Sequence, residues 1–430
     1  MTLALLCGAV GFLFLVLLFT NTHAVCLTLI GLTVAFPKAG VTIPHFPIPV
    51  FLFGLLIAIA GLALLNRQCW HRPPGLTIVA ILLGFLIFRC AVIAGVLPTT
   101  PVSTPGNLVP FTAWSLVPLA LYLMATQMDF LSARRSIQAA KIGYCIAAMY
   151  GVYQTVVGAG AALTIPGLTS SFGSTIRNNV ITSESGEIYN KIYSTYQSGN
   201  EFGVVSGVVL VMTVADLTRG KRDKLTAVTA ALGVFSLALS GSRTALVAGV
   251  VGLLVLVLSR RAITRLLIIA VCTFGAVELV RWLNPALAQR YDLSGQLAAN
   301  SSGGVRVTGS ENLIHQLNWA EWIVGALRPR SLMLIPDGVV GFVGYVGLIG
   351  LLLYIGFAVS VASGRGAQLR AMFTVLGTAL LVDSSYGNFP TWFIPAALIG
   401  MVVTAANKGT DTDAIPVRSG PLGRVFSTAQ

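Results

Sequence analysis

The sequence contains little charge. Asp, Glu, Lys and Arg together make up 10% of its 430 residues, whereas a soluble domain carries about 25%. The stretches 1–37 and 99–128 contain no charged residue. A chain with so few ionic groups has too little charged surface to be stable as a folded protein in water. This excludes a secreted enzyme and a cytosolic Rossmann or barrel fold, and the number of long apolar runs excludes a protein with a single membrane anchor.

The sequence also lacks paired cysteines. Its six cysteines form no C-x-x-C pair, and neither of its two long polar segments contains a cysteine. These absences exclude a disulfide framework and a zinc site. Those segments also lack His, Asp and Glu clustered at ligand spacing, so we predict no metal and no cofactor. The apolar run 2–20 lacks the basic flank of a secretory signal, which favours a retained helix.

Apolar residues are abundant and make up 55% of the chain. Long apolar runs predict membrane-spanning helices, and about 12 or 13 such runs occur. They lie at about 2–20, 24–36, 48–65, 75–97, 108–129, 139–163, 201–217, 225–240, 244–259, 262–282, 338–360, 370–384 and 389–406. We therefore expect an all-α fold, a polytopic transmembrane bundle. It forms one integral membrane domain over 1–406, followed by a polar tail over 407–430.

Basic residues cluster in alternate short loops between these runs, for example Arg134 and Arg135 and the segment Arg219–Lys224 (RGKRDK). Because basic loops stay in the cytoplasm, this pattern places the tail inside and two long polar loops, 166–200 and 284–336, outside. The net charge of +13 is thus explained by membrane topology, and no nucleic-acid partner is expected.

The second long loop contains a segment, 311–327, with apolar residues at helical spacing, among them Leu313 and Leu317. This spacing predicts one amphipathic helix at the outer interface, with Trp319 and Trp322 at the level of the lipid headgroups. His315 in the same segment is either an interfacial helix residue or a base.

A Gly–Ser–Arg turn within 237–246 is the sharpest local signal. Gly241 permits a tight turn, and a new helix is expected to begin at Ser242 and Arg243. An arginine beside a helix N-terminus suits a phosphate, because its guanidinium pairs bidentately with phosphate oxygens and the helix end adds N–H donors. The same pattern is equally typical of a helix cap whose arginine extends to lipid headgroups.

Three other polar residues stand at informative places. Arg89 lies inside an apolar run, where burying a charge is costly. Its side chain therefore either lines a polar cavity that binds substrate or extends to the membrane surface. Asp337 stands at the start of an apolar run. It is either the N-cap of the helix that begins there or a carboxylate that orients or deprotonates an acceptor hydroxyl. Tyr386, near an outer helix end, is a candidate for sugar contact.

Four segments together resemble a known family. They are GSRTAL at the turn, Phe36–Val50 (FPKAGVTIPHFPIPV), Tyr196–Leu210 (YQSGNEFGVVSGVVL) and Ile335–Leu353 (IPDGVVGFVGYVGLIGLLL). They are similar, in order and across most of the chain, to segments of the O-antigen polymerase and O-antigen ligase superfamily. This resemblance implies a membrane glycosyltransferase of the broad C class that acts on undecaprenyl-pyrophosphate-linked oligosaccharides. Its active site would face outward from the bacterial inner membrane.

The resemblance also implies roles for particular residues. Arg243 and Arg306 would hold the lipid pyrophosphate, with Arg290 as the alternative second arginine. Tyr196, Asn200 and Ser242 would contribute to substrate binding. Ligases of the family commonly have a histidine where this chain has Asp337, which favours a polymerase. The partners implied are the lipid-linked oligosaccharides, the lipid bilayer, a chain-length regulator and a flippase.

We therefore expect a polymerase that joins lipid-linked repeat units into a surface polysaccharide, such as O-antigen, capsule or exopolysaccharide. The transfer needs no metal, because a pyrophosphate is already a good leaving group and the site has only to stabilise its charge and position a hydroxyl. One alternative is a ligase that transfers glycan to lipid A core. Another is a polysaccharide or lipid transporter, although the two halves of the chain show no evident repeat.

Overall fold

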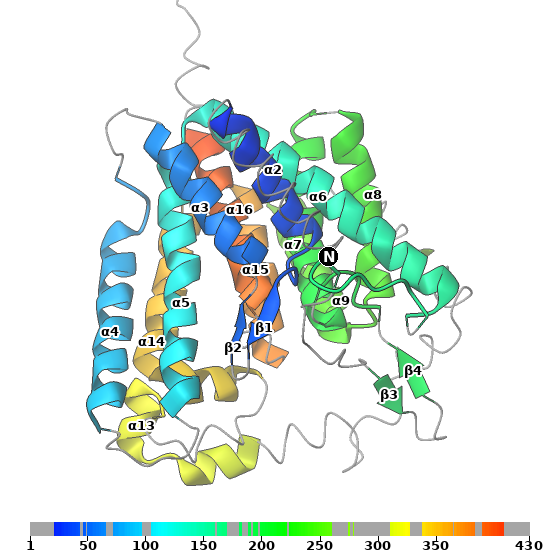
Figure 1. Cartoon of the computed structure of the whole chain (residues 1–430). Helices are drawn as coiled ribbons and strands as arrows, with labels where there is room; N and C mark the ends of the chain where they lie inside the picture. Colours follow the sequence, from blue (N-terminus) through cyan, green and yellow to red (C-terminus); the bar gives the residue numbers. More distant parts are fainter. Residues whose placement is uncertain are drawn as a thin grey trace, which may run out of the picture.

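A computed structural model of the chain provides the fold. It describes residues 21–43, 46–48, 50–65, 72–96, 105–159, 161–169, 180–182, 188–190, 192–196, 198–221, 223–259, 274–275, 278, 310–326, 338–363, 365–382 and 389–407. Over these residues the chain is a bundle of helices packed side by side (Figure 1). The predicted helix at 2–20, most of the predicted helix at 262–282 and the tail after residue 407 lie outside the described residues.

The helices follow the apolar runs of the sequence closely. They are α2 (Thr22–Ala35), α3 (Val50–Leu65), α4 (Leu76–Val96), α5 (Pro105–Thr126), α6 (Phe130–Val157), α7 (Gly199–Thr218), α8 (Lys224–Leu239), α9 (Arg243–Leu258), α13 (Trp319–Val324), α14 (Gly338–Ala362), α15 (Ala367–Val382) and α16 (Phe389–Asn407). Most are apolar on all sides, which is typical of helices buried in a large core or in a membrane. The expectation of a helical fold is confirmed.

Two of the described helices, α7 and α14, are long and apolar enough to cross a membrane by length and composition alone. Eight shorter apolar helices accompany them in the described part of the chain. Large apolar side chains also point outward from the bundle, including Ile57, Val156 and Leu352, which are 66%, 80% and 65% exposed. Extensive exposed apolar surface marks contact with lipid or with another protein.

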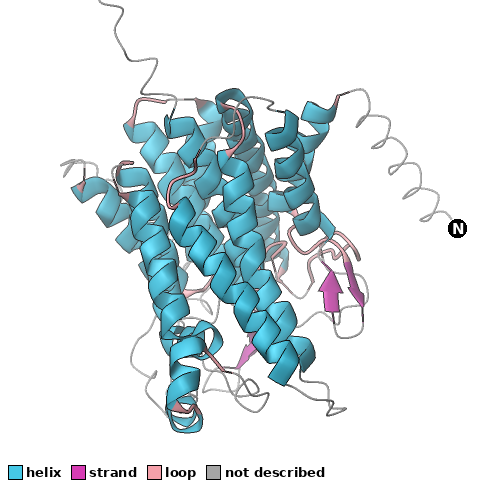
Figure 2. Cartoon of the chain, turned by 90° about the vertical axis from the view of Figure 1, so that its left-hand side faces the viewer, coloured by secondary structure: helices cyan, strands magenta, loops and turns pink. Residues whose placement is uncertain are grey.

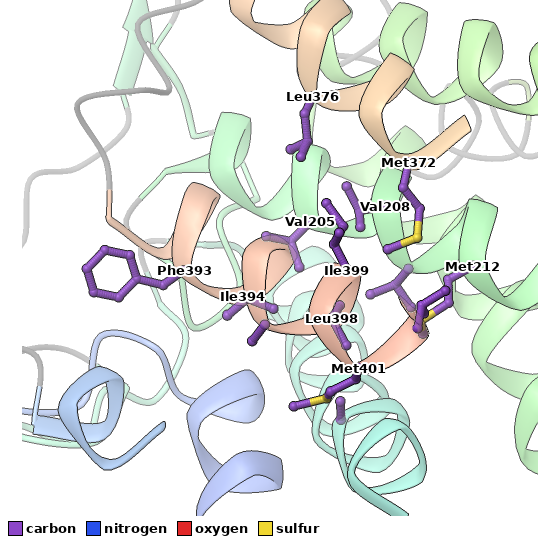
Figure 3. Packing of buried hydrophobic residues seen from close by; sticks show 14 of the residues in the cluster. Val205, Val208, Met212, Met372, Leu376, Phe393, Ile394, Leu398, Ile399 and Met401 are labelled. Carbon is purple, nitrogen blue, oxygen red and sulfur yellow. The ribbon is translucent and has the colours of Figure 1, made fainter. Parts of the chain in front are cut away.

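Helix α7 forms the centre of the bundle. Almost all of its residues are buried, and it packs against α8, α9, α15 and α16. Figure 3 shows part of this core, where Val205, Val208 and Met212 of α7 face Met372 of α15 and Leu398 of α16. Because its sides are enclosed by other helices, α7 holds its two ends in fixed positions relative to the rest of the fold.

Helices α2 and α6 cross at two glycines. A Cβ atom on Gly143 of α6 would collide with the backbone carbonyl of Gly31 in α2. Small residues at such crossings let two helix backbones approach closely, as is common where helices pack in membranes.

Replacing Gly143 with alanine is expected to destabilise the fold by about 1–3 kcal/mol, because the colliding group is backbone and the helices must move apart. The midpoint of thermal unfolding of the purified protein measures the effect. Gly84→Ala in α4 is the matched control, since a Cβ there meets nothing within 4 Å; alanine's better helix propensity makes that change neutral or slightly stabilising. Equal midpoints for the two variants would contradict the close crossing.

Two short antiparallel hairpins, which the sequence did not predict, lie outside the helices. Strand β1 (Val41–Ile43) pairs with β2 (Phe46–Ile48), and β3 (Val180–Thr182) pairs with β4 (Ile188–Asn190). Both hairpins lie toward the end of the bundle where α13 lies (Figures 1 and 2). The second hairpin belongs to the first predicted outer loop, so part of that loop has regular structure.

The prediction that Arg134 and Arg135 lie in a loop is wrong. Both residues lie in the first two turns of α6, which begins at Phe130 directly after α5 and not at about residue 139. The cause is Asp129, whose side chain caps the helix by accepting a hydrogen bond of 2.9 Å from the Ser132 amide. A good cap starts the helix before the apolar run begins, and the arginines project from its first turns.

The prediction of one continuous amphipathic helix over 311–327 is also wrong. Residues 310–316 are helical, the chain breaks at Leu317 and Asn318, and α13 follows. Asn318 starts the new helix because its side chain accepts a hydrogen bond from the Glu321 amide while the Glu321 carboxylate accepts one from the Asn318 amide. This reciprocal capping box satisfies two helix donors at once. Leu313 and Leu317 are nevertheless buried, as the spacing predicts.

Candidate functional site

The Gly–Ser–Arg turn has the local structure that the sequence predicts. Gly241 has a positive φ of 61°, a conformation that glycine adopts without strain, and it links α8 to α9. The Ser242 hydroxyl caps α9 by accepting a hydrogen bond of 3.2 Å from the Ala245 amide. Arg243 is the first residue of α9 and is half-buried. The arginine is thus fixed to the N-terminus of a helix by a buried cap.

The N-terminus of α7 lies against this turn. A Cβ atom on Gly203 would come within 2.6 Å of the Ala245 Cβ and 2.7 Å of the Ser240 hydroxyl, and one turn later Gly207 would contact Gly249. The two helices therefore run parallel, with both N-termini at the same end of the bundle. Each helix N-terminus carries about half a positive charge and unpaired N–H donors, so the pair favours an anion.

Two charged residues join the site from the start of α7 and from the segment after α2. Glu201 is in the first turn of α7, which Ser198 caps, and its charge acts on Lys38. Burial lowers the pKa of Lys38 below its ordinary value, and the Glu201 carboxylate opposes that shift. The ammonium of Lys38 also lies 5.2 Å from the centre of the Tyr193 ring, a cation–π distance.

Hydrogen bonds connect the segment before α7 to the end of α2. The Thr195 hydroxyl donates to the Ala35 carbonyl at 2.5 Å, and the Tyr196 hydroxyl donates to the Val34 carbonyl at 3.1 Å. Tyr196 is fully buried, and its ring lies 5.6 Å from that of Phe202. The Tyr196 hydroxyl is thus engaged with the backbone of α2, and the predicted contribution of Tyr196 to substrate binding remains a prediction. Asn200, four residues later in the sequence, is half-buried at the start of α7.

Arg89 lies apart from this cluster, inside the bundle. Its side chain is 2% exposed and donates a hydrogen bond of 3.2 Å to the carbonyl of Ala326, just after α13. The Ala326 amide in turn donates to the Gly344 carbonyl of α14 at 2.7 Å. Arg89 therefore holds the end of α13 between α4 and α14. Its predicted contact with substrate remains a prediction.

Asp337, Arg306, Arg290 and Tyr386 lie outside the described residues. Of the predicted site residues that are described, Asn200 lies in the first turn of α7, and Ser242 and Arg243 begin α9, whose N-terminus adjoins that of α7. Among the described residues, no group of three His, Cys, Asp or Glu side chains is placed to hold a metal ion.

Lys38 and Glu201 are absent from the residues predicted for the site. A signal for each is present in the sequence. Lys38 is the first charged residue of the chain and directly follows a long uncharged run. Glu201 is the single acidic residue in the segment Tyr196–Leu210. A charge at the edge of an apolar run is costly to bury, and an opposite charge at the edge of another run is its natural partner.

These features define the class of the protein. It is an α-helical bundle in which two of the described helices are suited to cross a membrane, with a polar cluster where the N-termini of two parallel helices meet. No protein-family model and no curated protein matches the chain.

Proposed function

We propose that the protein is a polytopic membrane glycosyltransferase that polymerises undecaprenyl-pyrophosphate-linked oligosaccharide repeats at the outer face of the bacterial inner membrane. One observation supports this proposal most. Three segments that resemble the O-antigen polymerase superfamily, far apart in sequence, contribute to one polar cluster. They supply Lys38, the α7 N-terminus with Asn200 and Glu201, and the turn with Ser242 and Arg243.

The chemistry of this cluster suits a pyrophosphate leaving group. During transfer, the bond between the sugar's anomeric carbon and the pyrophosphate oxygen breaks, and the acceptor hydroxyl oxygen forms the new bond. The departing lipid pyrophosphate gains negative charge. Arg243 and the N-termini of α7 and α9 would stabilise that charge without a metal, with Lys38 adding a second cation. In this proposal Arg306 completes the clamp, and Asp337 accepts the proton of the acceptor hydroxyl.

The direct test is polymerisation by the purified protein. The chain is reconstituted in proteoliposomes with a lipid-linked repeat unit as the only substrate, and products are separated by size on a gel. We expect a ladder of oligomers that remain attached to the lipid. Movement of the repeat across the bilayer without elongation would favour a transporter. Elongation only when lipid A core is added would favour a ligase.

The orientation of the bundle gives a separate prediction. Ser171 lies in the first predicted outer loop, and Lys221 lies at the opposite end of α7, where its side chain is 48% exposed. In a variant without the native cysteines, Ser171→Cys is expected to react with an impermeant thiol reagent in intact spheroplasts. Lys221→Cys is expected to react only after permeabilisation, because basic loops remain inside. The reverse pattern would place the candidate site in the cytoplasm and contradict the proposal.

A further inference from the structure

A second polar site lies at the far end of α7, about 25 Å along the helix from its N-terminus. A pocket of about 90 Å³ opens there between α6, α7, the start of α8, α15 and α16. Its polar lining consists of Arg134, Gln138, Lys141, Asp216, Arg219, Lys221, Asp223, Thr226 and Gln368. The pocket is too small for an oligosaccharide, and its residues have no part in the proposed transfer.

The two carboxylates of the pocket are already satisfied by other groups of the protein. Asp216 is buried and accepts from Lys141 at 2.9 Å through one oxygen and from Lys221 at 3.0 Å through the other. Asp223 accepts from the amide and the hydroxyl of Thr226 at 2.8 and 2.7 Å. Asp216 is thus neutralised by two ammonium groups, whereas Asp223 accepts from neutral groups. Four cations against two carboxylates leave the lining of the pocket with a net charge of +2.

The two arginines of the pocket are not neutralised in this way. Neither Arg134 nor Arg219 forms an ion pair with any described residue. Arg219 donates to the side-chain oxygen of Gln368 at 2.6 Å, and Gln368, which is 2% exposed, is itself fixed by donating to the Met212 carbonyl. This chain of hydrogen bonds holds one edge of the Arg219 guanidinium and leaves the group oriented on the pocket wall.

We propose that this pocket binds a phosphate group, either that of an anionic phospholipid headgroup or inorganic phosphate. Four cationic side chains line it against two carboxylates, and two of the cations are planar guanidiniums, which match phosphate oxygens in geometry as well as charge. Basic pockets between helix ends at one face of a membrane protein bind phospholipid headgroups. The site is independent of the proposed transfer reaction, since it lies at the other end of the bundle.

The test uses the full chain in detergent and measures its midpoint of thermal unfolding while phosphatidylglycerol, phosphatidylcholine or inorganic phosphate is added. Ligands that bind only the folded state raise this midpoint. We expect phosphatidylglycerol to raise it and phosphatidylcholine to leave it unchanged. A rise with inorganic phosphate at similar concentration would identify soluble phosphate as the source of the ligand. No rise with either phosphatidylglycerol or phosphate would overturn the proposal.

Two neighbouring arginines provide the matched comparison. Arg134 lines the pocket, whereas Arg135, next to it on α6, does not; both are exposed, so neither substitution disturbs the core. Arg134→Gln and Arg219→Gln are expected to raise the half-saturating ligand concentration at least about tenfold, as loss of a charged hydrogen bond predicts. Arg135→Gln removes the same charge and should change it little. Equal effects of Arg134→Gln and Arg135→Gln would mean nonspecific attraction and would overturn the proposed site.

Discussion

Replacing Arg243 with lysine is expected to slow polymerisation of lipid-linked repeats nearly as much as replacing it with alanine, by about 10²-fold or more. The cause is geometry. The buried Ser242 cap fixes the backbone of Arg243 at the N-terminus of α9, and a planar guanidinium at that place can make two parallel bonds to a phosphate. A lysine keeps the charge but makes only a point contact. The initial rate of oligomer formation in proteoliposomes measures the effect.

Arg370→Ala is the control for this experiment. Arg370 is exposed in the first turns of α15 and lies outside the cluster at the N-termini of α7 and α9. Its removal is expected to leave the rate nearly unchanged. All variants are compared at equal protein amount and with their unfolding midpoints checked, because a misfolded variant would resemble an inactive one. A folded Arg243→Ala protein that polymerises at the wild-type rate would remove the main support for the proposed pyrophosphate contact.

The second large effect concerns stability. Asp216→Asn is expected to lower the free energy of unfolding by about 3–5 kcal/mol, because it leaves the buried ammonium of Lys141 without its counter-charge. Lys141 and Asp216 side chains are 5% and 8% exposed, and their atoms lie 2.9 Å apart. The Thr226 hydroxyl, which also accepts from Lys141 at 2.8 Å, cannot replace a carboxylate. Equilibrium unfolding in mixed detergent micelles with increasing denaturing detergent measures the change.

The geometry predicts an unequal response from the two partners of this ion pair. Lys141→Met should cost less, about 1–3 kcal/mol, since Lys221 still donates to Asp216 at 3.0 Å. Lys221→Gln, at a half-exposed position, should cost at most about 1 kcal/mol. If Lys141→Met proved as damaging as Asp216→Asn, Lys221 would contribute nothing to the neutralisation of the carboxylate.

The helices could be predicted from the sequence because the signal for each is contained within it. An uncharged apolar run of about 20 residues has few other ways to satisfy its backbone groups in an apolar environment. The start of α6 was predicted wrongly because a single residue, Asp129, determines it. The two hairpins have strands of three residues each, which is too short for an alternating pattern to be recognised.

Contacts between distant residues account for most of what the sequence did not predict about the sites. Ser242 and Arg243 were predicted because the cap and the turn are local. Lys38 and Glu201 lie far apart along the chain, and each alone is typical of a charge at a membrane edge. The pairing of Lys141 with Asp216 was hidden in the same way, since the two residues are 75 positions apart in the sequence.

Helix α14 is broken at Gly347, and this break determines how the segment that contains α13 can move. At Gly347 the helix has a positive φ of 72°, and the backbone of Ile323, Val324 and Gly325 occupies the space where a Cβ on Gly347 would lie. Ala326 donates to the Gly344 carbonyl within the broken part of α14, and Arg89 donates to Ala326.

Separating α13 from α14 would break the hydrogen bond from Ala326 to Gly344 and the one from Arg89 to Ala326. The net cost is about 0.5–1.5 kcal/mol for the first and about 1.5–3 kcal/mol for the second, which involves a charged group. Residues 319–326 are therefore expected to move with α14 as one rigid unit. Amide hydrogen exchange in α13 should accordingly be slow and should match that of the first half of α14, whatever substrate is present. An entrance that opens and closes would have to use other parts of the chain.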